Sequence, residues 1–414
     1  MRRTIIAAAI GSIVMGLSGT AAAQSKQAKS AQVVKPPVAQ AWIDVATFSG
    51  MMGGMPGASV MEGLSGLFGG KKDAGNHFGM TQAGSTGRWL DVTLYTRNNP
   101  ALAEGAQAVP AGSLLAPSLT LIATPPEKPR PVPETDDEVS EPEPMERPKG
   151  KILFFWGCGD TVRSGQPKVL DMAQASPDAF AKFFQARRAT QRGAHQAPGR
   201  PVWPNPKDAR KVPEGASLVG EHAFSGEGVP ASFKLQIASQ QDFMPQINLS
   251  QRDAGTSTQL EWAALPTARA YFLSAMGARG ENEMVIWSSS EVPETGFGLM
   301  DYQTNPAVDR WLGEKVLLPP ATLKCAIPKE VFGQGGAMLR MIAYGSEASM
   351  AYPPRPTNPK IAWEPEWSAR VRVKSVANTM LGMPGMGDAG RGDVKQKPAE
   401  EPKPLDLLKG LFGK

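Results

Sequence analysis

The sequence predicts a mainly β protein, an antiparallel β-sandwich that contains one amphipathic helix and is flanked by disordered segments. Two observations favour this fold class. The 44 glycines and 38 prolines make up about one fifth of the 414 residues, against an average of about 12%, and therefore predict many turns. Between these turns, short segments alternate apolar and polar residues and are rich in β-branched and aromatic side chains, a pattern typical of strands in sandwiches and barrels.

The chain begins with a sequence typical of secretory signals. Two arginines precede an uncharged apolar stretch that ends at Leu17, and small residues then lead to an A-x-A cleavage pattern at 21–23. We therefore expect residues 1–23 to be a signal peptide and the mature protein to be exported to the periplasm or the cell envelope. Residues 24–41 are polar and rich in alanine, glutamine, lysine and proline, so we expect a disordered N-terminus there.

Two changes in composition divide the next part of the chain. Residues 42–122 form an N-terminal β region, in which a glycine- and methionine-rich segment, 50–70, separates two groups of expected strands. Residues 123–150 contain eight prolines and eight acidic residues but no aromatic residue. Such a segment buries no core, so we predict a disordered linker.

Residues 151–215 predict a strand, a glycine turn and a helix, in that order. The apolar run 151–156 is typical of a buried strand. A helix is predicted over 177–192, because Ser176 is a good N-cap, proline suits the first helical position, and three phenylalanines share one face. Three arginines crowd its last turn: Arg187, Arg188 and Arg192. They either complement the dipole of the helix or contact an anionic partner, such as an envelope polymer or lipid phosphate.

Residues 216–378 contain seven further segments with the character of strands and predict a β-sandwich region. Within them, Trp262 precedes a proline turn, and Tyr271 opens the next strand. Over residues 258–350 this pattern resembles the fibronectin type III family of immunoglobulin-like β-sandwiches. The resemblance implies a binding and spacer module in which Trp262 and Tyr271 fill the space between two sheets.

The two ends of the chain share a looser pattern. Trp42 and Trp367 each open an expected strand, which is followed by a Gly-Met-Pro-Gly sequence and a short segment with apolar residues on one helical face. The second copy lies in a glycine- and methionine-rich, polar tail, residues 379–414. Two interpretations stay open: a coincidence between two biased stretches, or docking of residues 45–70 and 405–414 on a partner, on a membrane surface or on each other.

Cys158 and Cys325 are the only cysteines of the chain. Both have apolar neighbours, and Cys158 follows a buried strand in a glycine turn. In an oxidising compartment we therefore expect the two to form a disulfide. The alternatives are a pair of buried free thiols, or a catalytic Cys158, for which no local motif supplies a base.

Methionine is the other unusual residue, with 19 copies. Thioether and imidazole ligands suit Cu(I), so the methionine clusters and one histidine are candidate soft-metal ligands. These candidates are Met51, Met52, Met55, His77, Met80, Met380, Met383 and Met386. The alternative is that these methionines are flexible apolar filler for irregular surfaces.

The sequence lacks the motifs of common enzyme classes. Its three histidines limit acid–base and metal chemistry, and no serine-hydrolase, zinc-protease or P-loop motif occurs. A hydrolase-like site built from scattered carboxylates stays open as an alternative, with four candidates: Glu281, Glu283, Asp301 and Asp309. The formal net charge of +5 is small and includes the two arginines of the signal, which argues against nucleic-acid binding.

These observations together predict an exported, non-enzymatic binding or scaffolding protein without a cofactor. Its expected partner is an envelope protein or polymer, and any peripheral membrane contact is expected at 45–70 and 405–414. A hydrolase with scattered carboxylates and a methionine-rich copper binder are the two alternative functions.

Overall fold

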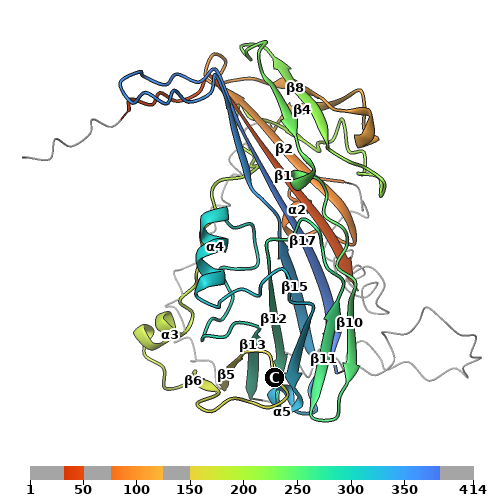
Figure 1. The fold of residues 1–414 in the computed structure, drawn as a ribbon, viewed down its shortest axis with the longest axis vertical. Helices are drawn as coiled ribbons and strands as arrows, with labels where there is room; N and C mark the ends of the chain where they lie inside the picture. Colours follow the sequence, from red (N-terminus) through yellow and green to blue (C-terminus); the bar gives the residue numbers. More distant parts are fainter. Residues whose placement is uncertain (1–31, 51–75, 125–149, 281, 383–414) are drawn as a thin grey trace, which may run out of the picture.

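The computed structural model describes residues 32–50, 76–124, 150–280 and 282–382 (Figure 1). These residues form a large mixed sheet of 14 strands, a small antiparallel sheet of three strands, and a few short helices. The prediction of a mainly β protein is therefore confirmed. The predicted signal peptide, the segment that follows Gly50, almost all of the predicted linker and the tail beyond Gly382 lie outside the described residues.

The large sheet brings together strands from every described part of the chain. In hydrogen-bonded order they are β6 (Lys168–Asp171), β5 (Lys151–Trp156), β13 (Glu283–Ser288), β12 (Ala270–Ala278), β15 (Ala337–Tyr344), β17 (Trp367–Leu381), β1 (Ala39–Gly50), β2 (Gly87–Thr96), β7 (Pro201–Trp203), β4 (Ser118–Ala123), β3 (Glu104–Ala108), β8 (Gly220–Gly226) and β9 (Lys234–Ile237). The fourteenth strand, β16 (Ala348–Tyr352), pairs with β17 but is not part of this linear order.

The remaining elements are short. The small sheet consists of β10 (Leu249–Asp253), β11 (Ser257–Trp262) and β14 (Lys324–Pro328). The described α-helices are α2 (Met80–Ala83), α3 (Pro177–Phe183), α4 (Asn305–Gly313) and α5 (Lys329–Phe332), with 3-10 turns at Ala111–Ser113 and Ser239–Gln241. None of the described helices is long and apolar enough to cross a lipid bilayer.

The two ends of the described chain lie side by side in the middle of the large sheet. All twelve residues of β1 pair in parallel with β17, from Ala39 opposite Trp367 to Gly50 opposite Asn378. On its other side, β1 pairs antiparallel with β2. The strands that contain Trp42 and Trp367 are therefore direct neighbours, and both run in the same direction.

Alternation along these strands gives the large sheet two different faces. One face is apolar and packs against the small sheet and the loop before it, where Met244, Leu260 and Trp262 are buried. The opposite face is apolar around Trp311 of α4, which packs on β12 and β15. Around β1, β2 and β17 the same face carries charged side chains that are nevertheless buried.

Cys158 and Cys325 form a disulfide, with their Cα atoms 5.1 Å apart. Cys158 follows β5 of the large sheet, and Cys325 lies in β14 of the small sheet. Both cysteines pack in the apolar core between these sheets. The bond therefore joins the two sheets across the apolar face.

The predicted antiparallel sandwich differs from this topology. The region that resembles fibronectin type III, residues 258–350, contributes strands to both sheets, and Trp262 contacts Tyr271 with ring centroids 5.6 Å apart. The expected regions 42–122, 151–215 and 216–378 share one large sheet, in which β1 pairs parallel with β17 and β5 with β13. Local alternation identifies strands, but the partner of each strand depends on contacts between distant residues.

The predicted helix over 177–192 is wrong beyond Phe183, where α3 ends. In the residues that follow, backbone N–H groups donate hydrogen bonds to side chains of other segments instead of to carbonyl oxygens one helical turn earlier. Ala189 donates to the Oε1 of Gln303 over 2.9 Å, and Ala194 donates to the Oδ2 of Asp44 over 3.1 Å. These side chains take the place of helical partners, so the segment crosses the charged face of the sheet as irregular structure.

The disorder predicted for residues 24–41 is wrong from residue 32 onward, and residues before it lie outside the described chain. Lys35 donates a backbone hydrogen bond to the oxygen of Trp363, and β1 begins at Ala39. The polar composition of this segment suggests disorder, because it carries no sign of the pairing with residues more than 300 positions away in the sequence.

Candidate functional site

A groove of about 530 Å³ lies on the charged face of the large sheet, where β1, β17 and β16 are neighbours. Three arginines and two tryptophans of the described chain line it: Arg192, Arg355, Arg370, Trp42 and Trp363. Small polar side chains of the strands form its floor. The groove is therefore built from segments at both ends of the chain and from one in the middle.

Arg370 reaches the groove from β17. Its Nη1 donates to the backbone oxygen of Arg192 over 3.3 Å, and its Nε lies 3.7 Å from a carboxylate oxygen of Glu347. The Nε is buried and has no hydrogen-bond partner among the described residues. Because a guanidinium has five N–H donors, Arg370 keeps donors for a ligand.

Arg355 and Trp363 come from an arm of the chain that projects from the body beyond the ends of β16 and β17 (Figure 1). The arm pairs with the N-terminal segment 32–38. The Nε of Arg355 donates to the Oε1 of Gln32 over 2.6 Å, and the guanidinium lies 5.6 Å from the centre of the Trp363 ring. These contacts hold a positive charge and an aromatic ring together in the lining of the groove.

Trp42 and Arg192 also line the groove. Trp42 lies on β1, with the His195 ring edge-on at 4.9 Å between centroids and the Arg200 guanidinium 5.3 Å from its ring centre. Arg192 is exposed and forms no ion pair with any described residue. Its positive charge is therefore directed at solvent or at a ligand.

The groove has an excess of positive charge. Within the described chain, Glu347 is the acid that pairs with one of its three arginines. Burial raises the pKa of Glu347, and the charge of Arg370 opposes this rise. A guanidinium matches the paired oxygens of a carboxylate or phosphate, so this arrangement suits an anionic ligand.

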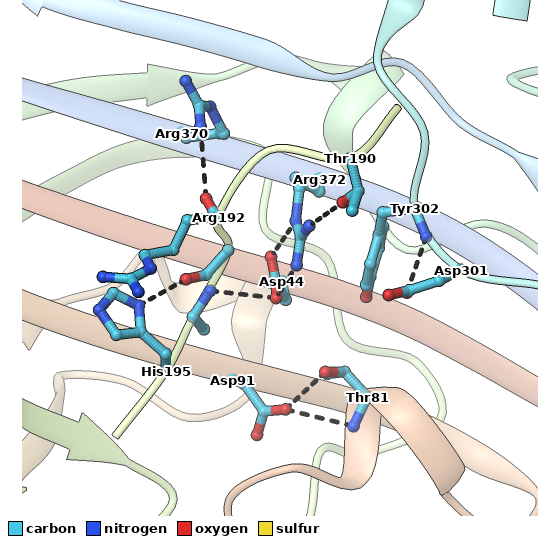
Figure 2. Close-up of polar contacts among 12 residues, drawn as sticks. Asp44, Thr81, Asp91, Thr190, Arg192, His195, Asp301, Tyr302, Arg370 and Arg372 are labelled. Carbon is cyan, nitrogen blue, oxygen red and sulfur yellow. Dashed lines mark hydrogen bonds and ion pairs between the residues drawn. The ribbon is translucent and has the colours of Figure 1, made fainter. Parts of the chain in front are cut away.

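A row of buried charged residues crosses the same face of the sheet (Figure 2). Asp91 of β2, Asp44 of β1 and Arg372 of β17 occupy paired positions on three adjacent strands. Arg372 donates from Nε to Asp44 Oδ1 over 2.7 Å and from Nη2 to Asp44 Oδ2. The side chains of Arg372 and Asp44 are only 6% and 1% exposed, so each charge depends on the other for stabilisation.

Asp91 is the second acid of this row and lies opposite Asp44. Its carboxylate accepts hydrogen bonds from the backbone of Gly79 over 3.0 Å and from the hydroxyl of Thr81 over 2.5 Å, at the start of α2. Burial raises its pKa to about 6, and the neighbouring charge of Asp44 adds to the rise. Asp91 therefore changes charge at mildly acidic pH.

Lys374 and Asp301 extend the charged face along β17. Lys374 is fully buried, and its Nζ lies 2.9 Å from Asp301 and 4.2 Å from the centre of the Tyr302 ring. Burial lowers the pKa of Lys374. Burial also acts to raise the pKa of Asp301, but the charge and hydrogen bond of Lys374 outweigh it, so the pKa of Asp301 is lowered.

The buried row positions the segment that carries Arg192. Arg372 donates from Nη1 to the Thr190 hydroxyl over 3.0 Å and to the Gln191 oxygen over 2.8 Å. Asp44 accepts the backbone N–H of Ala194. None of these buried charges lines the groove itself. Their role is therefore to hold its wall.

The structure separates the three arginines that the sequence placed on one helix end. Arg187 pairs with Glu294 over 3.0 Å and with Glu314 over 2.5 Å. Arg188 is exposed and does not line the groove, whereas Arg192 does. Of the three arginines expected to contact an anionic partner together, only Arg192 lines the groove, where the other arginines are Arg355 and Arg370.

The candidate metal ligands are placed only in part. Met51, Met52, Met55, Met383 and Met386 lie outside the described residues. His77 and Met80 line a second cavity of about 300 Å³ together with Arg88 and Lys211, whose charges disfavour a cation, and Met380 lies in β17. The described chain contains no group of three or more His, Cys, Asp or Glu side chains that could hold a metal ion.

The candidate carboxylates do not come together. Glu283 pairs with Arg279, Asp309 with Arg269 and Asp301 with Lys374, each in a different part of the fold. Glu281 lies outside the described residues. The residues that do come together, Arg355 and Arg370 among them, were not found from the sequence. The alternation of Arg370, Arg372 and Lys374 with apolar residues was the signal for one charged face of β17.

No protein-family model matches this sequence, and no curated protein matches it significantly. The interpretation of the groove therefore depends on its own geometry.

Proposed function

We propose that this protein is an exported, non-enzymatic binding protein whose groove holds the anionic groups of a ligand in the cell envelope. The observation that carries the proposal is the convergence of Arg192, Arg355 and Arg370 on one groove, where Glu347 pairs with Arg370 alone among the described residues. An anion there gains charge-assisted hydrogen bonds from groups that the fold already holds in place.

Two further observations support export. The first 23 residues have the three parts of a secretory signal. The disulfide between Cys158 and Cys325 is of the kind that persists in oxidising compartments. An anionic polymer of the envelope, as expected from the sequence, would meet the groove in that compartment.

Calorimetric titration of the mature, disulfide-bonded protein tests the proposal, with trigalacturonate and tripolyphosphate as anionic probes. We expect at least one probe to bind, with an affinity that falls as salt is added. The triple variant Arg192→Gln, Arg355→Gln, Arg370→Gln should lower that affinity at least tenfold, which is about 1.4 kcal/mol.

The matched control is Arg252→Gln, because Arg252 is exposed on β10 and outside the groove. It should bind like the wild type. Failure of the wild type to bind any anionic probe, or an equal loss in the Arg252 variant, would overturn the proposed function.

A further inference from the structure

The uncharged side chains of the groove distinguish between anionic ligands. Gln40 of β1, Ser349 of β16 and Ser368 of β17 line its floor. The amide and the two hydroxyls each donate and accept hydrogen bonds. A phosphate chain offers almost only acceptors, whereas the hydroxyl groups of a sugar both donate and accept. The floor therefore suits a ligand that carries hydroxyl groups as well as negative charge.

The aromatic lining points the same way. Trp42 and Trp363 both line the groove, and Ala351 adds apolar surface. Trp42 is only 8% exposed, whereas Trp363 is half-buried, so Trp363 offers the aromatic surface to a ligand. A sugar ring presents C–H groups on its two faces, and these pack against aromatic and apolar side chains. A small polyanion without a ring would leave this apolar surface uncovered.

The groove also lacks the usual backbone features of a phosphate site. Phosphate groups are commonly bound at helix N-termini or by consecutive backbone N–H groups in tight turns. The described lining residues lie in β1, β16, β17 and irregular segments, and none belongs to a described helix. Positive charge is supplied instead by arginine forks, which match carboxylates as well as phosphates.

We propose that the ligand of the groove is an acidic saccharide, in which the carboxylates bind the arginines, the hydroxyls bind Gln40 and the serines, and a ring face packs on Trp363. This inference rests on the proposed function and specifies its ligand class. No bond is formed or broken, so the saccharide leaves the groove unchanged.

The test compares probes that separate charge from the sugar ring. Trigalacturonate carries both, tripolyphosphate and tricarballylate carry charge alone, and maltotriose carries the sugar alone. At equal ionic strength, trigalacturonate should bind at least tenfold more tightly than either small polyanion, and maltotriose should show no measurable binding. Tighter binding of tripolyphosphate, of a single-stranded oligonucleotide or of an acidic peptide would overturn the saccharide while leaving an anion-binding groove in place.

Two variants test the assigned contacts. Gln40→Leu and, separately, Trp363→Leu should each weaken the binding of trigalacturonate about five- to tenfold. Gln40→Leu should leave the binding of tripolyphosphate unchanged, because it removes no charge and no contact of an arginine. Gln185→Leu is the control, since Gln185 is exposed outside the groove. Unfolding midpoints of all variants identify any loss of fold. A well-folded Gln40→Leu variant that binds trigalacturonate like the wild type contradicts the inference.

Discussion

Two adjacent rows of residues cross the same three strands, β2, β1 and β17, on opposite faces of the sheet. Val92, Ile43 and Val371 occupy the first row. The second row consists of Asp91, Asp44 and Arg372. All six residues are at most 5% exposed, so both rows are buried, although the first row is apolar and the second is charged.

The difference lies in what covers each row. The apolar row packs into the core shared with the small sheet, whose free energy comes from the removal of apolar surface from water. The charged row is covered by an irregular segment whose polar groups bond to it at Thr190, Gln191 and Ala194. One face therefore stabilises the fold through packing, and the other stabilises the position of a loop that forms a wall of the groove.

The largest expected effect follows from Arg372→Met. This change leaves Asp44 and Asp91 facing each other without their cation, and removal of one partner of a buried ion pair costs about 3–5 kcal/mol. Ile43→Val in the apolar row should cost only about 0.5–1.5 kcal/mol. Urea unfolding of both variants measures the contrast.

The double variant Asp44→Leu, Arg372→Met sharpens this test. Removing both charges leaves no uncompensated charge of the pair, so it should recover part of the stability that Arg372→Met loses. An Arg372→Met variant as stable as Ile43→Val would mean that the buried row contributes no more than ordinary packing.

The contrast between the rows also explains how far the sequence predicts the molecule. The alternation of apolar and polar residues in β17 correctly indicates a strand, and its apolar residues lie in the core. The same alternation places Arg372 and Lys374 on a face that an amphipathic strand usually exposes to solvent. Their burial depends on the segment around Thr190 and on Asp301, which are far away in the sequence, and no local pattern specifies that contact.

The groove was missed for the same reason. Its arginines, Arg192, Arg355 and Arg370, come from three separate segments, and only Arg192 was a candidate. The segment with Arg192 was expected to be helical because its caps and its aromatic face are good. The side chains of Asp44 and Arg372 bind the backbone around Ala194 and Gln191, and these tertiary contacts override the local preference.

The second expected effect concerns the pH dependence of stability through Asp91. Its pKa is about 6 in the folded protein and about 3.8 in the unfolded chain, so between these values the folded protein holds a proton that the unfolded chain has released. The contribution of Asp91 to the free energy of unfolding is therefore greatest below about pH 4, and from there it decreases by about 3 kcal/mol in total as pH rises through 6.

Asp91→Asn should remove this component. The difference in unfolding free energy between the wild type and the variant, measured from pH 4 to pH 7, should favour the wild type most at the acid end. A difference that does not change with pH across this range contradicts the raised pKa. Ile43→Val serves as a non-titrating control on the opposite face.

The smallest expected effect is that of Gly193→Ala, and it links the charged row to the groove. A Cβ atom at Gly193 would lie 1.8 Å from Nη2 of Arg372 and 2.4 Å from Oδ2 of Asp44, so the segment must move away from the row. Such overpacking costs about 1–3 kcal/mol. We expect a cost in the lower half of that range, because Gly193 lies in an irregular segment that can shift more easily than a strand. Gly313→Ala is the matched control, since its Cβ meets nothing within 4 Å.

The displacement should also move Arg192, the residue that directly precedes Gly193. We therefore expect Gly193→Ala to weaken trigalacturonate binding several-fold, although no ligand-contacting side chain is changed. Gly313→Ala should leave binding unchanged and should not lower stability, since alanine suits the helical position better than glycine. If Gly193→Ala lowers the unfolding free energy but binds trigalacturonate like the wild type, the buried row supports the fold alone, and its role in positioning Arg192 is wrong.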